Sequence, residues 1–200
     1  MIVARGPAPA SYSSYRQFLP HLARLFKRRC AYCLTSDSLL GGEEGMRVDH
    51  FCSQRWHPKR VLDWSNLYYS CDKCNTFKSD HPRPAEVSAG ERFVDCCVED
   101  PDLHFRMTQD RKRRSWCIVL PLSAPAKYTV DTLRFNKRRF LRETWRSIDD
   151  AIAKEVKYIE ELQGFLKRAT DLTLQGDILK LIRKRRGVMA SKSKMRPFPL

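Results

Sequence analysis

Apolar side chains recur every three or four residues in two stretches of this chain, which is the spacing of an amphipathic helix. The first stretch, residues 15–29, predicts a helix that ends in a basic run just before Cys30. Its apolar positions are Phe18, Leu19, Leu22, Leu25 and Phe26. Pro20 lies inside this stretch, so it either begins the regular helix or kinks it.

The second stretch predicts one long helix over residues 136–163. Its apolar stripe consists of Leu141, Trp145, Ile148, Ile152, Val156, Ile159 and Leu162. A stripe of this kind is more often buried within its own protein than offered to a partner. Asp171 is placed to cap a further helix, and Gly187 stands where that helix is expected to end.

Shorter stretches predict strands. Residues 46–51 and 66–70 read as two short strands, the second of them rich in aromatic side chains. A short helix is expected from Cys74 to about Ser79, because the prolines within residues 81–84 cannot continue it. The local order is therefore strand, loop, strand, helix.

A second pair of strands is predicted over residues 103–107 and 116–120, joined by a strongly basic loop. Hydrophobic residues make up 42% of the chain, which is enough to bury a real core. The expected parts are an extended lead-in, a core, an α+β to helical extension and a basic flexible tail, over residues 1–14, 15–85, 86–187 and 188–200.

Two Cys-x-x-Cys pairs frame the first two predicted strands. They are Cys30, Cys33, Cys71 and Cys74. Each pair offers two sulfurs from one tight turn, and four thiolates are a common ligand set of structural Zn²⁺ sites. A redox pair is the alternative, but it would not need a second pair. The other cysteines are expected not to be ligands, namely Cys52, Cys96, Cys97 and Cys117.

The N-terminal residues 1–7 lack the apolar region of a secretion signal. No apolar run approaches the roughly 20 residues that a membrane span needs. We therefore expect a cytoplasmic protein with no membrane partner, in which the thiols stay reduced and the paired cysteines bind metal.

Positive charge is concentrated in the C-terminal half. The formal net charge is +15, of which residues 1–100 contribute +2 and residues 101–200 contribute +13. Phosphate backbones are the commonest partner of such an excess. A solvated basic surface and attraction to anionic lipid are the alternatives.

Four polar residues lie between and just after the cysteine pairs. They are Asp49, His50, Asn66 and Asn75. A carboxylate and an amide oxygen suit Mg²⁺, and a neutral histidine can take a proton from an attacking water near pH 7. Asn66 cannot titrate, so it would hold the loop and the imidazole through hydrogen bonds. The pattern favours a site that hydrolyses phosphodiesters.

These motifs resemble the HNH nucleases, which have the ββα-metal fold. The resemblance covers residues 30–80 and rests on the segments Val48-Asp-His-Phe51, Ser65-Asn-Leu67 and Cys71-Asp-Lys-Cys-Asn-Thr-Phe-Lys78. It implies an α+β protein whose ββα-metal core is held by the four-cysteine zinc site. An N-terminal helix, a β-hairpin and a C-terminal helical extension would surround that core.

The resemblance also implies roles for the polar residues. His50 would be the general base and Asn66 the central asparagine, while Asp49 and Asn75 would ligate the catalytic Mg²⁺ or Mn²⁺. Expected DNA contacts are Lys78, Arg47, Arg111, Lys112, Arg113 and Arg114. No base-reading element is visible, so we do not expect sequence specificity.

The chain departs from the HNH pattern at two places. Ser53 stands where many members carry a proline, and Ser79 stands where some carry a further histidine. Two protein ligands then remain for the catalytic metal. His57 or His81 could approach it instead.

The layout beyond the motif more loosely resembles the HNH subunits of bacterial anti-phage systems such as Septu and some retrons. The shared features are a lead-in helix, an acidic segment at residues 93–101, a hairpin and a helix that starts Leu-Arg-Phe-Asn. Those proteins usually act with an ATPase partner, so the resemblance implies the nuclease subunit of a defence complex. The alternative is a non-catalytic, zinc-stabilised subunit that binds nucleic acid or serves assembly.

Overall fold

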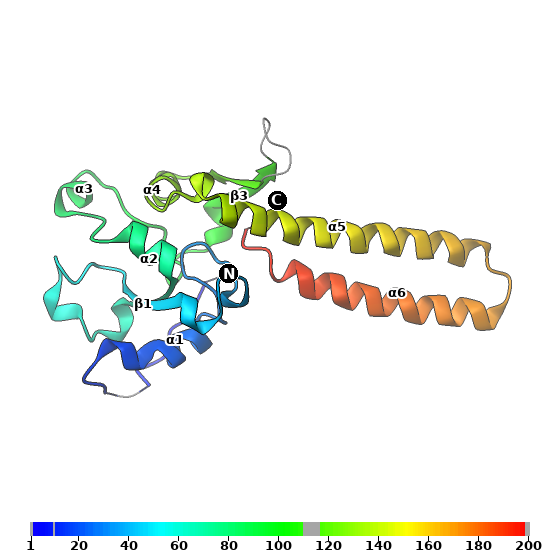
Figure 1. Ribbon diagram of the computed structural model, residues 1–200, viewed down its shortest axis with the longest axis horizontal. Coiled ribbons are helices and arrows are strands. Elements are labelled where there is room, and N and C mark those ends of the chain that lie inside the picture. Colours follow the sequence, from blue (N-terminus) through cyan, green and yellow to red (C-terminus); the bar gives the residue numbers. More distant parts are fainter. Residues whose placement is uncertain (1, 10, 110–116, 199–200) are drawn as a thin grey trace.

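The computed structural model describes residues 2–9, 11–109 and 117–198. It shows an α+β core from which a long hairpin of two helices projects to one side (Figure 1). Two separate antiparallel sheets of two strands each lie in the core. The predicted mixture of helices and short antiparallel strands is confirmed.

The first sheet and the helix after it follow the predicted order. Strand β1 (Met46–His50) pairs with β2 (Leu67–Cys71) so that Met46 lies opposite Cys71 and His50 opposite Leu67. Helix α2 (Asp72–Lys78) follows β2 directly. Every side chain of β2 is buried, because other parts of the chain cover both faces of this strand.

Helix α1 (Leu19–Leu25) packs against this first sheet. Pro20 lies in its first turn, so it begins the helix rather than kinking it. The lead-in before α1 is attached to the core through Arg5, whose two terminal nitrogens donate to the carbonyls of Trp64 and Leu67, each at 2.8 Å. The Arg5 guanidinium also lies 4.4 Å from the centre of the Tyr68 ring.

The second sheet is the predicted downstream hairpin, shifted by one or two residues. Strand β3 (Phe105–Gln109) pairs with β4 (Cys117–Pro121). The short helix α3 (Pro84–Ser88) precedes this sheet and α4 (Ala124–Thr132) follows it. The basic loop with Arg111, Lys112, Arg113 and Arg114 lies outside the described residues.

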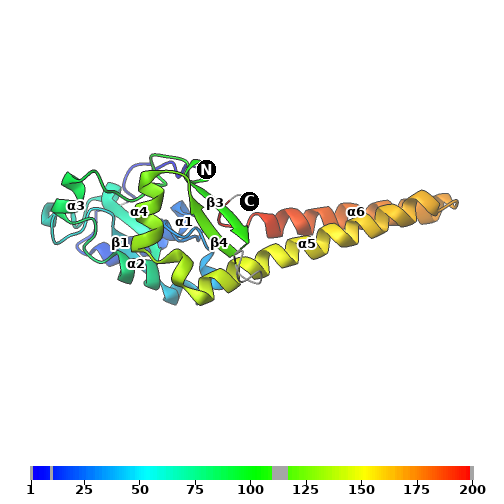
Figure 2. The ribbon, with the colours of Figure 1, turned by 90° about the horizontal axis from the view of Figure 1, so that it is seen from above.

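The projecting hairpin consists of α5 (Arg139–Arg168) and α6 (Leu172–Ser193). Its proximal part is docked on the core through Trp145, which is fully buried and whose Nε1 donates to Thr35 Oγ1 at 2.8 Å. Farther out the two helices cover each other and extend beyond the core as a narrow arm (Figure 2). Within the described ranges, no helix combines the length and apolarity needed to cross a membrane.

The apolar stripe of α5 is largely buried, as expected for an intramolecular role. Six of its seven positions are buried, against the core near the start of the helix and against α6 farther out. Val156 is the exception, with 38% of its surface exposed. The helix begins three residues later than predicted and continues five residues farther.

The predicted end of the last helix at Gly187 is wrong, because α6 continues to Ser193. A glycine inside a helix costs about 1 kcal/mol relative to alanine. Ion pairs between α5 and the C-terminal part of the chain offset this cost. Lys192 lies 2.7 Å from Glu155, and Arg196 lies 2.7 Å from Asp149. Where a flexible tail was predicted, the described residues continue α6 to Ser193 and then pack on the core through Phe198.

The segment after α6 returns to the core and buries Phe198. This ring is 2% exposed and lies 4.8 Å from the Phe105 ring and 5.9 Å from the Trp145 ring. The C-terminal segment is thus fixed by an aromatic cluster that also contacts β3 and α5.

Phe198→Ala should lower the free energy of unfolding by about 3 kcal/mol, because it leaves a cavity in this aromatic cluster. Urea denaturation followed by tryptophan fluorescence would measure the change. Phe140→Ala is the matched control, since Phe140 is 65% exposed, and it should change stability by less than about 0.5 kcal/mol. Equal effects of the two substitutions would contradict the burial of Phe198.

Candidate functional site

Four cysteines from the two predicted pairs meet in one cluster. The sulfurs of Cys30, Cys33, Cys71 and Cys74 all lie within 4.8 Å of one another, and all four residues are buried. The backbone N–H of Cys71 donates to Cys30 Sγ at 3.3 Å, and that of Cys74 donates to Cys71 Sγ at 3.4 Å. The predicted cluster is confirmed, and four converging sulfurs with N–H donors around them fit a tetrahedral metal such as zinc.

A cation from a distant part of the sequence lies against this cluster. Arg138, which immediately precedes α5, donates from Nη1 to Cys74 Sγ at 3.1 Å. Burial by itself lowers the pKa of the Arg138 guanidinium, but the neighbouring thiolates of Cys74, Cys33 and Cys71 raise it above its ordinary value. Arg138 therefore stays charged and offsets part of the negative charge of the four sulfurs.

The thiols themselves titrate unequally. Burial raises the pKa of the Cys30 thiol, whereas hydrogen bonds from Cys30, Cys33 and Cys74 lower the pKa of Cys71. A divalent cation would replace the protons that these four buried groups share, and metal binding should therefore release protons.

Asp49 lies near the end of β1 and forms a buried ion pair. Its side chain is 5% exposed, and its Oδ1 lies 3.3 Å from Nζ of Lys78, which is fully buried. Its other oxygen accepts a hydrogen bond from the Tyr32 hydroxyl. Burial and the Asp49 carboxylate both raise the pKa of Tyr32, so this hydroxyl remains a donor.

Lys78 belongs to the interior. Its ammonium also donates to the backbone oxygen of His50 at 2.6 Å and lies 5.9 Å from the centre of the Phe93 ring. The expectation that Lys78 contacts DNA is therefore wrong for this structure. The lysine instead joins α2 to the end of β1.

His50 lies at the end of β1 with its ring held on two sides. Its Nε2 is 3.0 Å from the backbone oxygen of Val61, and the Tyr15 ring packs edge-on at 4.8 Å between centres. Tyr15 and Val61, the two residues that contact this ring, also line a groove of about 460 Å³. The residue is buried, with 7% of its surface exposed.

Asn66 holds the loop that follows β1. Its Oδ1 accepts from the N–H of Cys52 at 2.8 Å, and its Nδ2 donates to the carbonyls of Cys52 at 3.0 Å and Arg60 at 3.2 Å. The side chain is 1% exposed and reaches backbone groups rather than the imidazole. This loop carries Val61, so Asn66 fixes the carbonyl that His50 contacts.

The remaining predicted site residues are more dispersed. Asn75 is half-buried on α2, and its side chain makes no hydrogen bond to another described residue. His57 is exposed, while Nδ1 of His81 lies 2.8 Å from Glu86. Arg47 is half-exposed and pairs with Asp72 at 3.3 Å, so it remains available at the surface.

Three residues that the motifs did not single out complete the surroundings of the site. Arg138 contacts the sulfurs, Tyr32 contacts Asp49 and Tyr15 contacts His50. Tyr32 stands inside the first cysteine pair, a position that ties its backbone to the cluster. No local pattern pointed to Arg138, which is 64 residues from Cys74.

Comparison with known proteins gives a distant relative. No protein-family model matches the chain. A curated protein from Bacillus thuringiensis, named Septu protein PtuB, is 29% identical over 117 residues. The aligned region covers 58% of this chain and 40% of that protein, so the chain spans less than half the length of its relative.

Proposed function

We propose that this chain is a metal-dependent HNH endonuclease that hydrolyses DNA phosphodiester bonds and serves as the nuclease subunit of a bacterial anti-phage defence system. The observation that carries the proposal is the held geometry of His50 at the end of β1. The similarity to Septu protein PtuB supports the defence role, and the four-cysteine cluster supports a structural zinc ion.

The contact between His50 and Val61 selects the tautomer of the neutral imidazole. A backbone oxygen only accepts, so Nε2 must carry the hydrogen at 3.0 Å from Val61. In the neutral ring Nδ1 then keeps its lone pair, and no described residue donates to it. We assign to Nδ1 the removal of a proton from the attacking water.

The arrangement around His50 serves this role in two further ways. Asn66 fixes the loop that presents the Val61 carbonyl, which keeps the tautomer constant. The Lys78 ammonium, bound to the His50 carbonyl and to Asp49, fixes the end of the strand from the opposite side. Each contact restricts how the imidazole can rotate or withdraw.

The proposed Mg²⁺ or Mn²⁺ ion would need protein ligands of its own. Asp49 does not fit a metal as it is arranged here, because one oxygen faces Lys78 and the other accepts from Tyr32. A nearby ammonium also opposes a divalent cation electrostatically. We therefore assign no step of the reaction to the metal. Of the two predicted ligands, Asn75, whose side chain makes no hydrogen bond to another described residue, remains available to the ion.

Cleavage of plasmid DNA in the presence of Mg²⁺ or Mn²⁺ tests this function. His50→Ala should reduce cleavage by about 10²–10⁴-fold, the usual contribution of a general base, and EDTA should abolish cleavage by the wild type. His21→Ala, on α1, is the matched control and should cleave normally.

Three outcomes would change this assignment. If His50→Ala cuts as well as the wild type, the catalytic assignment is wrong. If the wild type binds DNA without cutting it under all metal conditions, the chain is the non-catalytic binding subunit instead. Cleavage that requires a co-purified protein would favour a nuclease that works only within a complex.

The arm supplies the proposed contact with the DNA backbone. Helix α6 exposes Arg183, Lys184 and Arg186, and none of them pairs with an acidic group among the described residues. Lys180 and Arg185, by contrast, pair with Asp177 and Glu155. Unpaired cations along one helix can follow a phosphate backbone.

Replacing these three residues together by glutamine should weaken DNA binding and reduce its salt dependence. The slope of log K against log salt should fall by about 0.9 for each phosphate that the arm no longer neutralises. Fluorescence anisotropy with a labelled duplex at several salt concentrations would measure it. Lys127→Gln is the control, because Lys127 lies on α4 and pairs with Asp131 at 2.7 Å. An unchanged slope would assign the basic arm to another partner.

A further inference from the structure

A second group of metal-binding side chains lies away from the four-cysteine cluster. The ligand atoms of Asp95, Cys96 and Cys97 lie within 4.8 Å of one another. The two cysteines were expected not to be ligands, because neighbours on one strand point to opposite faces. They lie in a turn rather than a strand, so both sulfurs can approach the same point.

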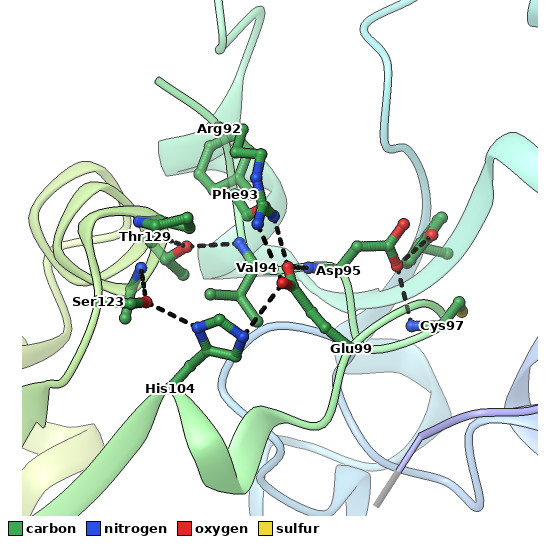
Figure 3. Close-up of polar contacts among 12 residues, drawn as sticks. Arg92, Phe93, Val94, Asp95, Cys97, Glu99, His104, Ser123 and Thr129 are labelled. Atoms are coloured by element: carbon green, nitrogen blue, oxygen red, sulfur yellow. Dashed lines mark hydrogen bonds and ion pairs between the residues drawn. The ribbon is translucent and has the colours of Figure 1, made fainter. Parts of the chain in front are cut away.

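The turn is fixed by its own backbone and by Asp95. The Asp95 carbonyl accepts from the N–H of Val98 at 3.0 Å and from that of Glu99 at 2.9 Å. Asp95 Oδ1 accepts from the N–H of Cys97 at 2.9 Å and from the Tyr68 hydroxyl at 2.7 Å. Figure 3 shows these bonds converging on one carboxylate oxygen and leaving the other uncommitted.

The surroundings hold the turn in place beyond these local bonds. The N–H of Asp95 donates to Glu99 at 2.9 Å, and Glu99 is itself paired with Arg92 and with His104 at 3.1 Å (Figure 3). On the other side, the N–H of Val3 in the lead-in donates to the Cys96 carbonyl at 2.7 Å. The three candidate ligands are therefore positioned before any ion binds.

A positive charge already lies near this group. Arg5 lies close enough to both cysteines to act on them electrostatically, and its Nε is buried without a hydrogen-bond partner among the described residues. Once both thiols have lost their protons to a bound metal, two thiolates and one carboxylate carry three negative charges. A divalent cation together with Arg5 would balance them, which is what a partly buried site requires.

We propose that Asp95, Cys96 and Cys97 form a second site for a thiophilic divalent cation of the Zn²⁺ class. The Asp95 carboxylate and the two sulfurs would supply three ligands, and a water molecule would complete the tetrahedron. Binding would release the two thiol protons to solvent. The site would fasten the lead-in and residues 93–99 to Tyr68 on β2.

This site should exchange its ion more readily than the four-cysteine cluster. Asp95 and Cys97 are half-buried, whereas all four cysteines of the cluster are buried. It also has three protein ligands rather than four. A chelator should therefore remove one ion quickly and the other slowly.

The number of zinc ions per chain tests the proposal. Native mass spectrometry of the full chain, with excess zinc removed, should find two ions in the wild type and one in Cys96→Ser/Cys97→Ser. The matched control is Cys52→Ser/Cys117→Ser, which changes two cysteines outside both clusters and should keep two ions. One ion in the wild type, or two in Cys96→Ser/Cys97→Ser, would overturn the proposal.

Asp95→Asn tests whether Asp95 binds the ion, without removing the hydrogen bonds that hold the turn. The asparagine Oδ1 can still accept from Cys97 and Tyr68, but the charged Oδ2 is gone. The second ion should bind at least about tenfold more weakly, measured by competition with a zinc-binding dye. Unchanged affinity would show that Asp95 is not a ligand. Circular dichroism should match the wild type, because no bond of the turn is lost.

Discussion

A Cys71→Ser variant is expected to lose its bound zinc and the cooperative unfolding transition of the wild type. Cys71 lies where β2 ends and α2 begins, and its sulfur accepts from the Cys74 N–H and from Arg138. Structural zinc sites in small folds contribute about 10–16 kcal/mol of apparent binding free energy. The first sheet has only two short strands, so it depends on this link.

Cys117→Ser is the matched control for this prediction. Cys117 is buried, and its Sγ donates to Asp149 at 3.5 Å, a bond that a serine hydroxyl can also make. Zinc content by mass spectrometry and thermal melting by circular dichroism should separate the two variants clearly. If Cys71→Ser keeps its zinc and the melting temperature of the wild type, the cluster is not a structural metal site.

Lys78→Met is expected to destabilise the fold by about 3–5 kcal/mol, because it leaves Asp49 buried without its cation. The lysine side chain is 0% exposed and bridges Asp49 and the His50 carbonyl. Methionine fills a similar volume but offers no donor. Lys73→Met on the exposed face of α2 should change stability by less than about 0.5 kcal/mol.

The double variant Asp49→Asn/Lys78→Met tests the mechanism of that loss. It removes the buried charge together with its partner, so it should be more stable than Lys78→Met alone. Urea denaturation of the wild type, both single variants and the double variant completes the cycle. If the two single effects simply add, the two side chains do not interact.

The first sheet and the four-cysteine cluster could be predicted because their signals are local. The residue types that favour a strand, and the prolines that end a helix, act over a few neighbouring residues. Each cysteine pair likewise forms its own tight turn. The two turns flank the hairpin of β1 and β2, so pairing of these strands brings the two cysteine pairs together. The short helix after β2 followed from the same local signals.

The interior position of Lys78 could also have been predicted. Cys74 and Lys78 are four residues apart on a short helix, so they lie on one face. Since Cys74 was expected to be buried as a ligand, the lysine had to point the same way. Lys78 was instead expected to contact DNA, because lysines near nuclease motifs often bind phosphate.

Long-range packing could not be predicted from local patterns. Phe198 is 93 residues from Phe105, whose ring it contacts, and Arg138 is 64 residues from Cys74. Glycine is common at helix ends, yet packing and ion pairs with α5 keep α6 regular through Gly187. In each place tertiary contacts outweighed local preference.

Both ends of the arm are attached to the core, and this affects how the arm would respond to force. Arg138, at the base of α5, grips the sulfurs beside the first sheet, while Phe198, beyond the end of α6, sits in the aromatic cluster against β3. An arm with one attachment would swing like a hinge and leave the core undisturbed. Here, a sideways force on the distal tip would reach both sheets, because one end of the arm is attached beside each of them.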